Sequence, residues 1–410
     1  MTLTGRPLPS PRVAARRSLL GGSDGRLLDQ GLVLWFPGPA SFTGEDVGEL
    51  HVHGGRAVIA SVLATLGGMQ GLRPAEAGEF SRRAFINGKM DLTQAEGLAD
   101  LIAAETDTQR AQALRQLDGA LGTLYNEWRR ALIRAQAHVE AAFDFSDEEL
   151  PGNLISGAAA AVGIVVGQMK SHLDDGRRGE RLRDGARVAI VGPPNAGKSS
   201  LINVLAGRDV AIVSERAGTT RDVIEVHLDL DGLPVTIADT AGLREVEEGV
   251  EREGVRRAYN RAADADLILA VIDGKQLPGL DPETVKLLDD RSLVVVNKTD
   301  LLDKAPAGEI DGHAAVAISC RTGKGIDRLL AQVVKRIGDL VGEGPALTRA
   351  RHRAALSECV AALDRFAEID TPELAAEEIR HAVRALGRIT GRVDVEDILD
   401  VIFSEFCIGK

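Results

Sequence analysis

The chain has few cysteines and no long apolar run, and each shortage excludes a class of protein. Three cysteines are spread over 410 residues without a CxxC pair, so neither a disulfide framework nor a zinc knuckle is predicted. This usage fits a reducing, cytoplasmic environment. No run approaches the roughly 18 apolar residues that a membrane span needs, so we expect no membrane association. The longest weakly polar run, residues 154–167, is predicted to be a buried helix.

The chain also has no net positive charge, because it contains 49 basic and 61 acidic residues and its formal charge is −12. A general polyanion binder gains affinity by releasing counterions and carries the opposite charge. We therefore expect any nucleic-acid contact to be local or supplied by a partner.

The spacing of apolar residues divides the chain into parts. From about residue 28 to 88, short apolar runs alternate with Gly and Pro, which predicts a small α/β domain. Three- and four-residue spacings predict helices before and after a central region of short β-branched runs, which is typical of a parallel sheet with crossover helices. One helical domain with an inserted α/β domain explains this order, although two separate helical domains would also do so. The predicted boundaries are 1–88, 89–182, 183–340 and 341–410, and the strands of the insertion are 188–191, 235–238, 267–272, 293–296 and 315–318.

The strongest motif is the glycine-rich turn GPPNAGKS at residues 192–199, between a predicted strand and a predicted helix. Successive backbone N–H groups and a helix N-terminus suit a polyphosphate. Lys198 would reach the β and γ oxygens, and the Ser199 hydroxyl would bind Mg²⁺. The alternative is a chance glycine-rich turn, which the flanking strand and helix argue against.

Two further motifs follow in the order that a nucleotide switch requires. Thr220, in GTTR at residues 218–221, can be a second magnesium ligand that senses the γ-phosphate. The motif DTAG at residues 239–242 ends another strand and would place the Asp239 carboxylate near the metal and the Gly242 amide near the γ-phosphate.

The motif NKTD at residues 297–300 predicts the base. The Asp300 carboxylate can accept from both N1–H and N2–H₂ of guanine, whereas adenine would turn an acceptor toward it and leave a buried charge unpaired. Guanine is therefore predicted over adenine. The sequence SCR at residues 319–321 is expected to support the base through backbone amides.

Hydrolysis needs a group that orients water, and Leu243, which follows DTAG, cannot do so. The group must come from elsewhere. The segment 244–253 holds several acids, and spacing alone does not separate Glu251 from its acidic neighbours, most of which are expected to be solvated charges on a switch segment.

Together with FPGP at residues 36–39, SFTGED at 41–46 and the terminal FCIGK at 406–410, these motifs resemble the MnmE (TrmE) family of tRNA-modification GTPases over almost the whole chain. The resemblance implies a multidomain α/β plus all-α protein: an N-terminal α/β folate-binding and dimerising domain, a discontinuous helical domain and an inserted Ras-like P-loop G domain. It also implies a homodimer that joins an MnmG-type FAD flavoprotein in a heterotetramer. That complex adds a carboxymethylaminomethyl-type group to C5 of the wobble uridine in tRNA.

The resemblance further assigns roles to single residues. Asn195 would help to hold a potassium ion against the phosphates, in place of an arginine finger, while G domains pair across their nucleotide faces. The acid matching Glu251 would orient the attacking water. The potassium ligands implied are Asn195, Ser214, Arg216 and Thr219. The residues expected to contact GTP are Asn195, Ala196, Gly197, Lys198, Ser199, Ser200, Ser214, Glu215, Arg216, Ala217, Gly218, Thr219, Thr220, Asp239, Thr240, Ala241, Gly242, Asn297, Lys298, Asp300, Ser319, Cys320 and Arg321.

By the same matching, Glu49, Lys89 and Lys410 would line a 5-formyl-tetrahydrofolate site, with the acid on the pterin ring and the lysines on the glutamate tail. Solvated side chains are the alternative for all three. Cys407 is the family's terminal cysteine, and both a nucleophile and a small packing residue fit it. Residues 1–27 do not resemble the Gly- and Arg-containing strand that opens the family, so a late start codon or a truncated chain is expected, and folate binding and N-terminal dimerisation have less support than GTP binding.

Other readings stay open. His51 and His53 would share one face of a strand, but no third metal ligand is evident, so packed or solvated histidines are predicted. A ribosome-assembly GTPase resembling Era or Der shares the G-domain motifs, although it would not predict the terminal motif. A nucleotide-gated scaffold that only holds the flavoprotein and tRNA is a third possibility.

Overall fold

The computed structural model divides the chain into two compact units, and each is described by itself. The first comprises Met1–Ala99, Leu117–Tyr125 and Gly387–Lys410, and the second Asp100–Gln116 and Asn126–Leu386. The structure describes residues 2–21, 25–144, 154–208, 210–212, 225–238, 262–277, 280–304, 306, 308–338, 347–369, 371–393, 396–404 and 406.

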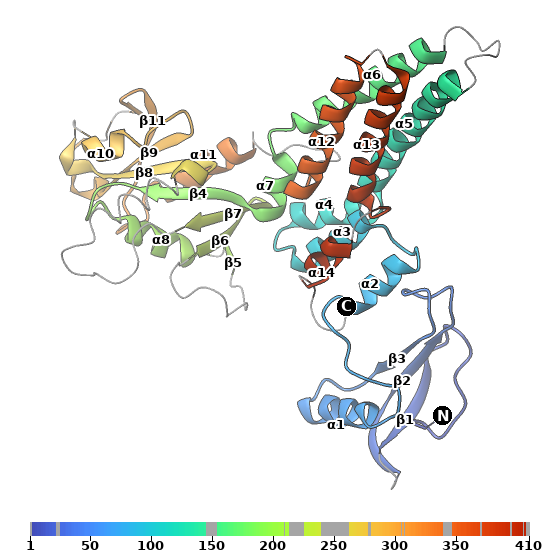
Figure 1. The fold of residues 1–410 in the computed structure, drawn as a ribbon. Helices are drawn as coiled ribbons and strands as arrows, with labels where there is room; N and C mark the ends of the chain where they lie inside the picture. Colours follow the sequence, from blue (N-terminus) through green and yellow to red (C-terminus); the bar gives the residue numbers. More distant parts are fainter. Residues whose placement is uncertain are drawn as a thin grey trace, which may run out of the picture. The chain divides into compact units, whose positions relative to one another are not determined.

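The first unit begins with a three-stranded antiparallel sheet. Its strands, in spatial order, are β1 (Ala15–Gly21), β2 (Arg26–Phe36) and β3 (Val47–His51). Helix α1 (Arg56–Gly67) covers one face, because Val62 packs with Leu19 and Val33 in one apolar core (Figure 1). The predicted α/β domain is confirmed.

Helix α2 (Glu79–Ile86), most of α3 (Leu92–Ala103) and α14 (Glu396–Ser404) also belong to this unit. Phe403 of α14 packs with Leu92, and its ring lies 6.4 Å from that of Phe85. Gly78, with φ 66°, precedes α2, and a Cβ there would lie 2.5 Å from the Phe403 carbonyl oxygen. The C-terminal helix therefore closes a core that begins three hundred residues earlier.

The second unit contains an eight-stranded sheet ordered β10-β11-β9-β8-β4-β7-β6-β5. The bounds are β4 (Ala186–Val191), β5 (Ala211–Ile212), β6 (Glu225–Leu230), β7 (Leu233–Ala238), β8 (Leu267–Asp273), β9 (Ser292–Asn297), β10 (Glu309–Ile310) and β11 (His313–Ala317). The five central strands run parallel, as predicted, with ends shifted by at most two residues. The short antiparallel strands β5, β6 and β10 at the edges were not predicted.

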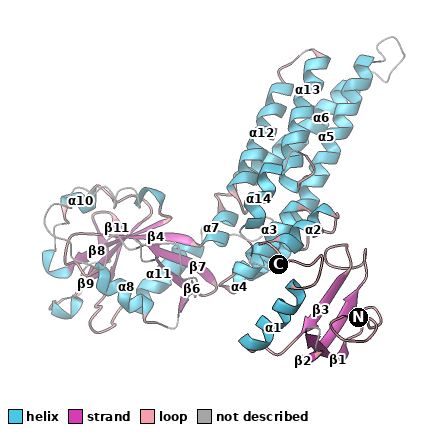
Figure 2. Cartoon of the chain, turned by 60° about the horizontal axis from the view of Figure 1, so that its bottom comes forward, coloured by secondary structure: helices cyan, strands magenta, loops and turns pink. Residues whose placement is uncertain are grey.

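Helices α8 (Lys198–Ala206) and α11 (Ile326–Gly338) cover one face of the sheet (Figure 2). Leu201 and Leu205 of α8 and Leu329 of α11 share one buried core with Ile190 of β4 and Leu269 of β8. The central strands are apolar on both faces, as parallel strands between helices are. The domain also contains the short helix α10 (Pro282–Val285).

Helices that precede this sheet in the chain and helices that follow it form one bundle (Figure 1). Their bounds are α4 (Asp107–Leu117), α5 (Ala120–Asp144), α6 (Leu154–Leu173), α7 (Arg178–Asp184), α12 (Ala350–Phe366) and α13 (Pro372–Thr390). Lys170 of α6 pairs with Asp364 of α12 at 2.8 Å, and Glu140 of α5 pairs with Arg380 of α13 at 2.8 Å. A single helical domain interrupted by the sheet is therefore the correct alternative.

Helix α6 differs from its prediction. By length and composition it could cross a membrane, whereas no such segment was expected, and only 22% of its apolar window is buried. The buried residues form one stripe, Ala158, Val162, Val165 and Met169, and Met169 contacts Cys359 of α12. Ile164 on another face is 65% exposed. The prediction of a buried helix was wrong because composition does not reveal how many faces of a helix find partners.

Asp100 joins the two ends of the inserted domain. Its Oδ1 accepts hydrogen bonds from Arg183 Nε at 3.0 Å and from an Arg349 guanidinium nitrogen at 2.8 Å. Arg183 lies just before β4, and Arg349 lies directly before α12. The carboxylate thus holds the segment that enters the sheet against the segment that leaves it.

Candidate nucleotide-binding site

The glycine-rich turn lies between β4 and α8, as predicted. Gly192 and Gly197 have φ values of 140° and 101°, which L side chains rarely adopt. A Cβ on Gly192 would lie 2.0 Å from the Val271 carbonyl oxygen, and one on Gly197 would lie 2.1 Å from Asn297 Nδ2. Gly197 is also the N-cap of α8 and supplies no side-chain cap, so the first N–H groups of the helix suit an anion.

Lys198 lies over this turn. Its Nζ donates to the carbonyl oxygens of Gly192 and Pro193, both at 2.9 Å. The ammonium is therefore held at the loop that would take the phosphates, and Ser199 follows it in the first turn of α8. The roles of both residues toward a nucleotide stay predictions.

The loops that would read the base are joined to the turn by Asn297. Its Nδ2 donates to the Ala196 carbonyl at 3.0 Å, and its Oδ1 accepts from the Cys320 backbone N–H at 3.1 Å. The side chain is buried at the end of β9. Burial raises the pKa of the Cys320 thiol to about 11, so the residue stays neutral and acts here through its backbone.

Two neighbours contact the carboxylate of Asp300, the predicted base reader. Its Oδ1 accepts from Ser319 Oγ at 2.7 Å, and its Oδ2 lies 3.3 Å from Arg321 Nε. The Ser319 hydrogen bond, with a smaller contribution from Arg321, holds the pKa of Asp300 below its ordinary value. Because the Arg321 side chain is 78% exposed, a base can displace it at little cost. Side chains of this loop thus support Asp300, whereas the sequence predicts that its backbone amides support the base.

Sequence reasoning missed Asp273. This residue ends β8 and lies opposite Asn297 in the pairing of β8 with β9. Its Oδ2 accepts from Lys298 Nζ at 2.8 Å, and Lys298 also donates to the Asn195 carbonyl at 2.7 Å. The Lys298 hydrogen bond is the main reason why the pKa of Asp273 is lowered. An acid at the carboxyl end of a buried parallel strand is the signal that could have found it.

Several predicted residues lie outside the described part of the chain, and their roles stay predictions. They include the second magnesium ligand, three potassium ligands and the water-orienting acid. The residues are Ser214, Glu215, Arg216, Ala217, Gly218, Thr219, Thr220, Asp239, Thr240, Ala241, Gly242, Glu251, Cys407 and Lys410.

Two family models match nearly the whole chain. The model described as the MnmE helical domain matches residues 92–407, and the one described as the GTP-binding protein TrmE N-terminus matches residues 2–89. The chain belongs to the MnmE family. The predicted family and fold class are confirmed, and this MnmE-family chain is a GTPase.

Curated relatives resemble the chain over its full length. The tRNA modification GTPase MnmE of Paramagnetospirillum magneticum is 58% identical over 410 residues, which cover 100% of this chain and 92% of the relative. That of Rhodospirillum rubrum is 55% identical over 424 residues, covering 100% and 93%. The mitochondrial 5-taurinomethyluridine-[tRNA] synthase subunit GTPB3 of Danio rerio is 49% identical over 433 residues, covering 99% and 87%.

The N-terminal residues predicted for folate have separate partners in this MnmE-family chain. Glu49 on β3 lies 3.0 Å from His51 Nε2, and Lys89, just after α2, donates to the Pro39 carbonyl at 3.1 Å. His53 pairs with Asp29 at 2.8 Å. Both histidines are exposed, as the solvated alternative predicts.

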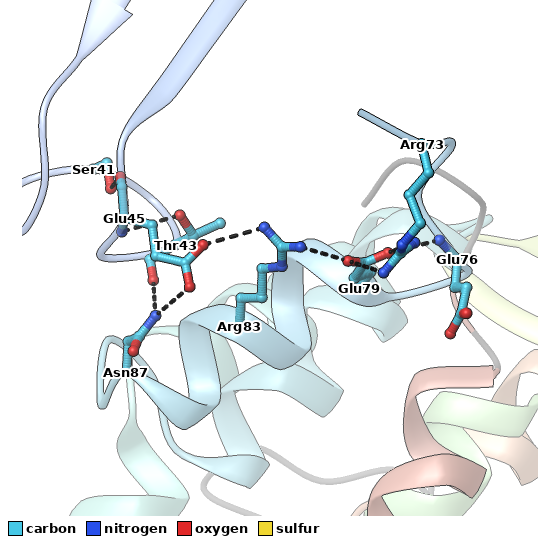
Figure 3. Close-up of polar contacts among 8 residues, drawn as sticks. All are labelled: Ser41, Thr43, Glu45, Arg73, Glu76, Glu79, Arg83 and Asn87. Atoms are coloured by element: carbon cyan, nitrogen blue, oxygen red, sulfur yellow. Dashed lines mark hydrogen bonds and ion pairs between the residues drawn. The ribbon is translucent and has the colours of Figure 1, made fainter. Parts of the chain in front are cut away.

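A network of charged side chains connects helix α2 with the loop between β2 and β3 (Figure 3). Glu79 accepts from Arg73 through both oxygens at 2.8 Å, from the Glu76 backbone N–H at 2.9 Å and from Arg83 at 2.7 Å. The bonds from Arg73, then that from Glu76 and last that from Arg83, lower the pKa of Glu79 to about 2. Arg83 also contacts Glu45 in the loop at 3.2 Å. The family motif in this loop is therefore anchored to α2.

Proposed function

We propose that this MnmE-family chain hydrolyses GTP to drive modification at C5 of the tRNA wobble uridine, together with an MnmG-type FAD flavoprotein. The observation that carries the nucleotide part is the direct link between the base motif and the phosphate loop through Asn297. The names of the relatives, which are tRNA-modifying proteins, support the choice of substrate. The ribosome-assembly alternative does not account for the two family-model matches.

Different residues of the proposed site would bind the base, the phosphates and the metal ion. The ionised Asp300 would hold the guanine edge, and the start of α8 with Lys198 would hold the phosphates. Glycines at 192 and 197 let the turn pack closely against Val271 and Asn297, and the Ser199 hydroxyl that follows is a ligand type that suits Mg²⁺. With Thr220, Ser199 would hold that ion, which neutralises charge on the β- and γ-phosphates when bound.

Hydrolysis is expected to depend on potassium. In the proposal, Asn195 with Ser214, Arg216 and Thr219 holds K⁺ against the phosphates as the G domains of a homodimer pair. Phosphate release from GTP should then be about tenfold or more faster in potassium than in sodium buffer. Equal rates in the two salts would remove the cation from the mechanism.

The Glu251→Ala variant separates nucleotide binding from hydrolysis within the same assay. If Glu251 orients the attacking water, the variant should bind GTP within about twofold of the wild type and lose most of its turnover in potassium. Glu247→Ala is the matched control and should keep its turnover. Persistent hydrolysis in Glu251→Ala would assign the water to another acid.

The proposed tRNA modification is tested by following labelled carbon from folate into the wobble uridine. We propose that Glu49, Lys89 and Lys410 form a site for the one-carbon folate 5-formyl-tetrahydrofolate. With the flavoprotein and labelled folate, label should enter the wobble uridine. A Glu49→Ala, Lys89→Ala double variant should reduce that label by about tenfold while GTP turnover stays within about twofold. The amount of label in the wobble uridine is measured by mass spectrometry of tRNA nucleosides. An amount that is the same in the double variant and the wild type would favour the scaffold alternative.

A further inference from the structure

Two successive residues at the end of β9 reach the same stretch of the phosphate loop. Asn297, at the end of β9, donates to the carbonyl of Ala196, and the next residue, Lys298, donates to the carbonyl of Asn195. Successive side chains thus hold successive carbonyls. Lys298 is in turn held by Asp273, at the end of β8.

We propose that Asp273 is a positioning residue for guanine-nucleotide binding, which acts by fixing Lys298 between the base motif and the phosphate loop. The inference rests on the proposed nucleotide site and adds a residue to it. The Asp273 side chain hydrogen-bonds to Lys275 and Lys298, and to neither Asn297 nor Asp300, so we expect its effect to pass through Lys298.

Both oxygens of Asp273 are engaged, which fixes the carboxylate itself. Oδ2 accepts from Lys298, and Oδ1 accepts from the backbone N–H of Lys275 at 3.0 Å, which caps the short 3₁₀ helix Gly274–Gln276. The side chain is only 17% exposed. Because a lysine has a flexible stem and a freely rotating ammonium, it needs such a fixed anion to keep one geometry.

The geometry of Asn195 shows what Lys298 holds in place. Asn195 has φ 60°, a left-handed conformation that asparagine adopts more readily than most residues other than glycine. Its carbonyl is anchored by Lys298, and the other end of the same peptide unit, the Ala196 N–H, bonds to the Pro193 carbonyl at 3.4 Å. Since a peptide unit is planar, fixing both of its ends fixes the plane of the loop where phosphates would lie.

The test measures nucleotide release from the full-length chain. In Asp273→Asn, stopped-flow release of N-methylanthraniloyl-GDP should be about tenfold faster, and Kd about tenfold higher, because the neutral amide holds Lys298 less firmly. Asp289→Asn is the matched control, since Asp289 also pairs with a cation, Arg291 at 2.6 Å, in the same domain. The control should stay within about twofold of the wild type.

A double-mutant cycle separates this role from a general loss of stability. In a Lys298→Ala background, Asp273→Asn should change Kd by less than about twofold, because the group through which it acts is gone. Additive effects, or wild-type affinity in Asp273→Asn, would overturn the inference. Circular dichroism of the nucleotide-free variant checks folding, and Asp273→Ser replaces Asp273→Asn in the cycle if the latter does not fold. A wild-type chain that does not bind GDP would overturn the proposed function instead.

Discussion

The Asp300→Asn variant should bind GTP about 100-fold more weakly or worse and should gain affinity for xanthosine triphosphate. The wild-type carboxylate offers two acceptors to N1–H and N2–H₂ of guanine. An asparagine replaces one acceptor with a donor, which clashes with the guanine amine but matches the carbonyl that xanthine carries there. Ser319 and Arg321 already hold this carboxylate in its charged form.

Isothermal titration with GTP, xanthosine triphosphate and ATP measures this switch. Asp303→Asn, which changes an exposed carboxylate three residues further along, is the control and should bind GTP as the wild type does. Because the pKa of Asp300 is lowered, GTP affinity of the wild type should persist into mildly acidic buffer and fall only as the pH drops through that lowered value. Tight GTP binding by Asp300→Asn would contradict the assignment of Asp300 to the base.

The Gly197→Ala variant should bind GDP about 100-fold more weakly. The new methyl group would lie 2.1 Å from Asn297 Nδ2 at a backbone φ of 101°, so both the conformation and the contact are unfavourable. Asn297 is 2% exposed and is bonded to Ala196 and Cys320. If Asn297 moves aside, it breaks the connection between the base motif and the phosphate loop.

A matched glycine distinguishes this effect from that of any added methyl group. Gly163 lies in α6, and a Cβ there would meet open space, with no neighbouring atom within 4 Å. Gly163→Ala should therefore leave GDP affinity unchanged and raise the melting temperature slightly. Fluorescent GDP titration and thermal unfolding measure both variants. GDP affinity in Gly197→Ala within about threefold of the wild type would show that Asn297 can yield without loss.

Motifs whose chemistry lies in adjacent residues could be found from the sequence. The turn at residues 192–199 and the NKTD motif at 297–300 each carry their donors and acceptors within a few positions, and the structure places both at the carboxyl ends of the predicted strands. Asp273 could not be found in this way. Its partner Lys298 is 25 residues away, and their contact depends on which strands are neighbours and on the register of β8 with β9.

Burial was harder to predict than secondary structure. The apolar run at 154–167 is helical, as predicted, but neighbours cover only one stripe of α6. The anchoring of Glu45 by Arg83 was also out of reach, because two solvent-accessible charges in distant segments give no sequence pattern. Periodicity reports the shape of an element, whereas its environment depends on the rest of the fold.

Asp100 brings together the two ends of the inserted G domain. The two arginines that it binds are 166 positions apart, 183 and 349, yet both meet one carboxylate oxygen. The G domain is thus an insertion whose first and last residues join the bundle at a single point. The entropy lost when such a loop is closed is only slightly larger for a long segment than for a short one. A whole domain could therefore be gained or exchanged between these two arginines while the helices around it kept their packing.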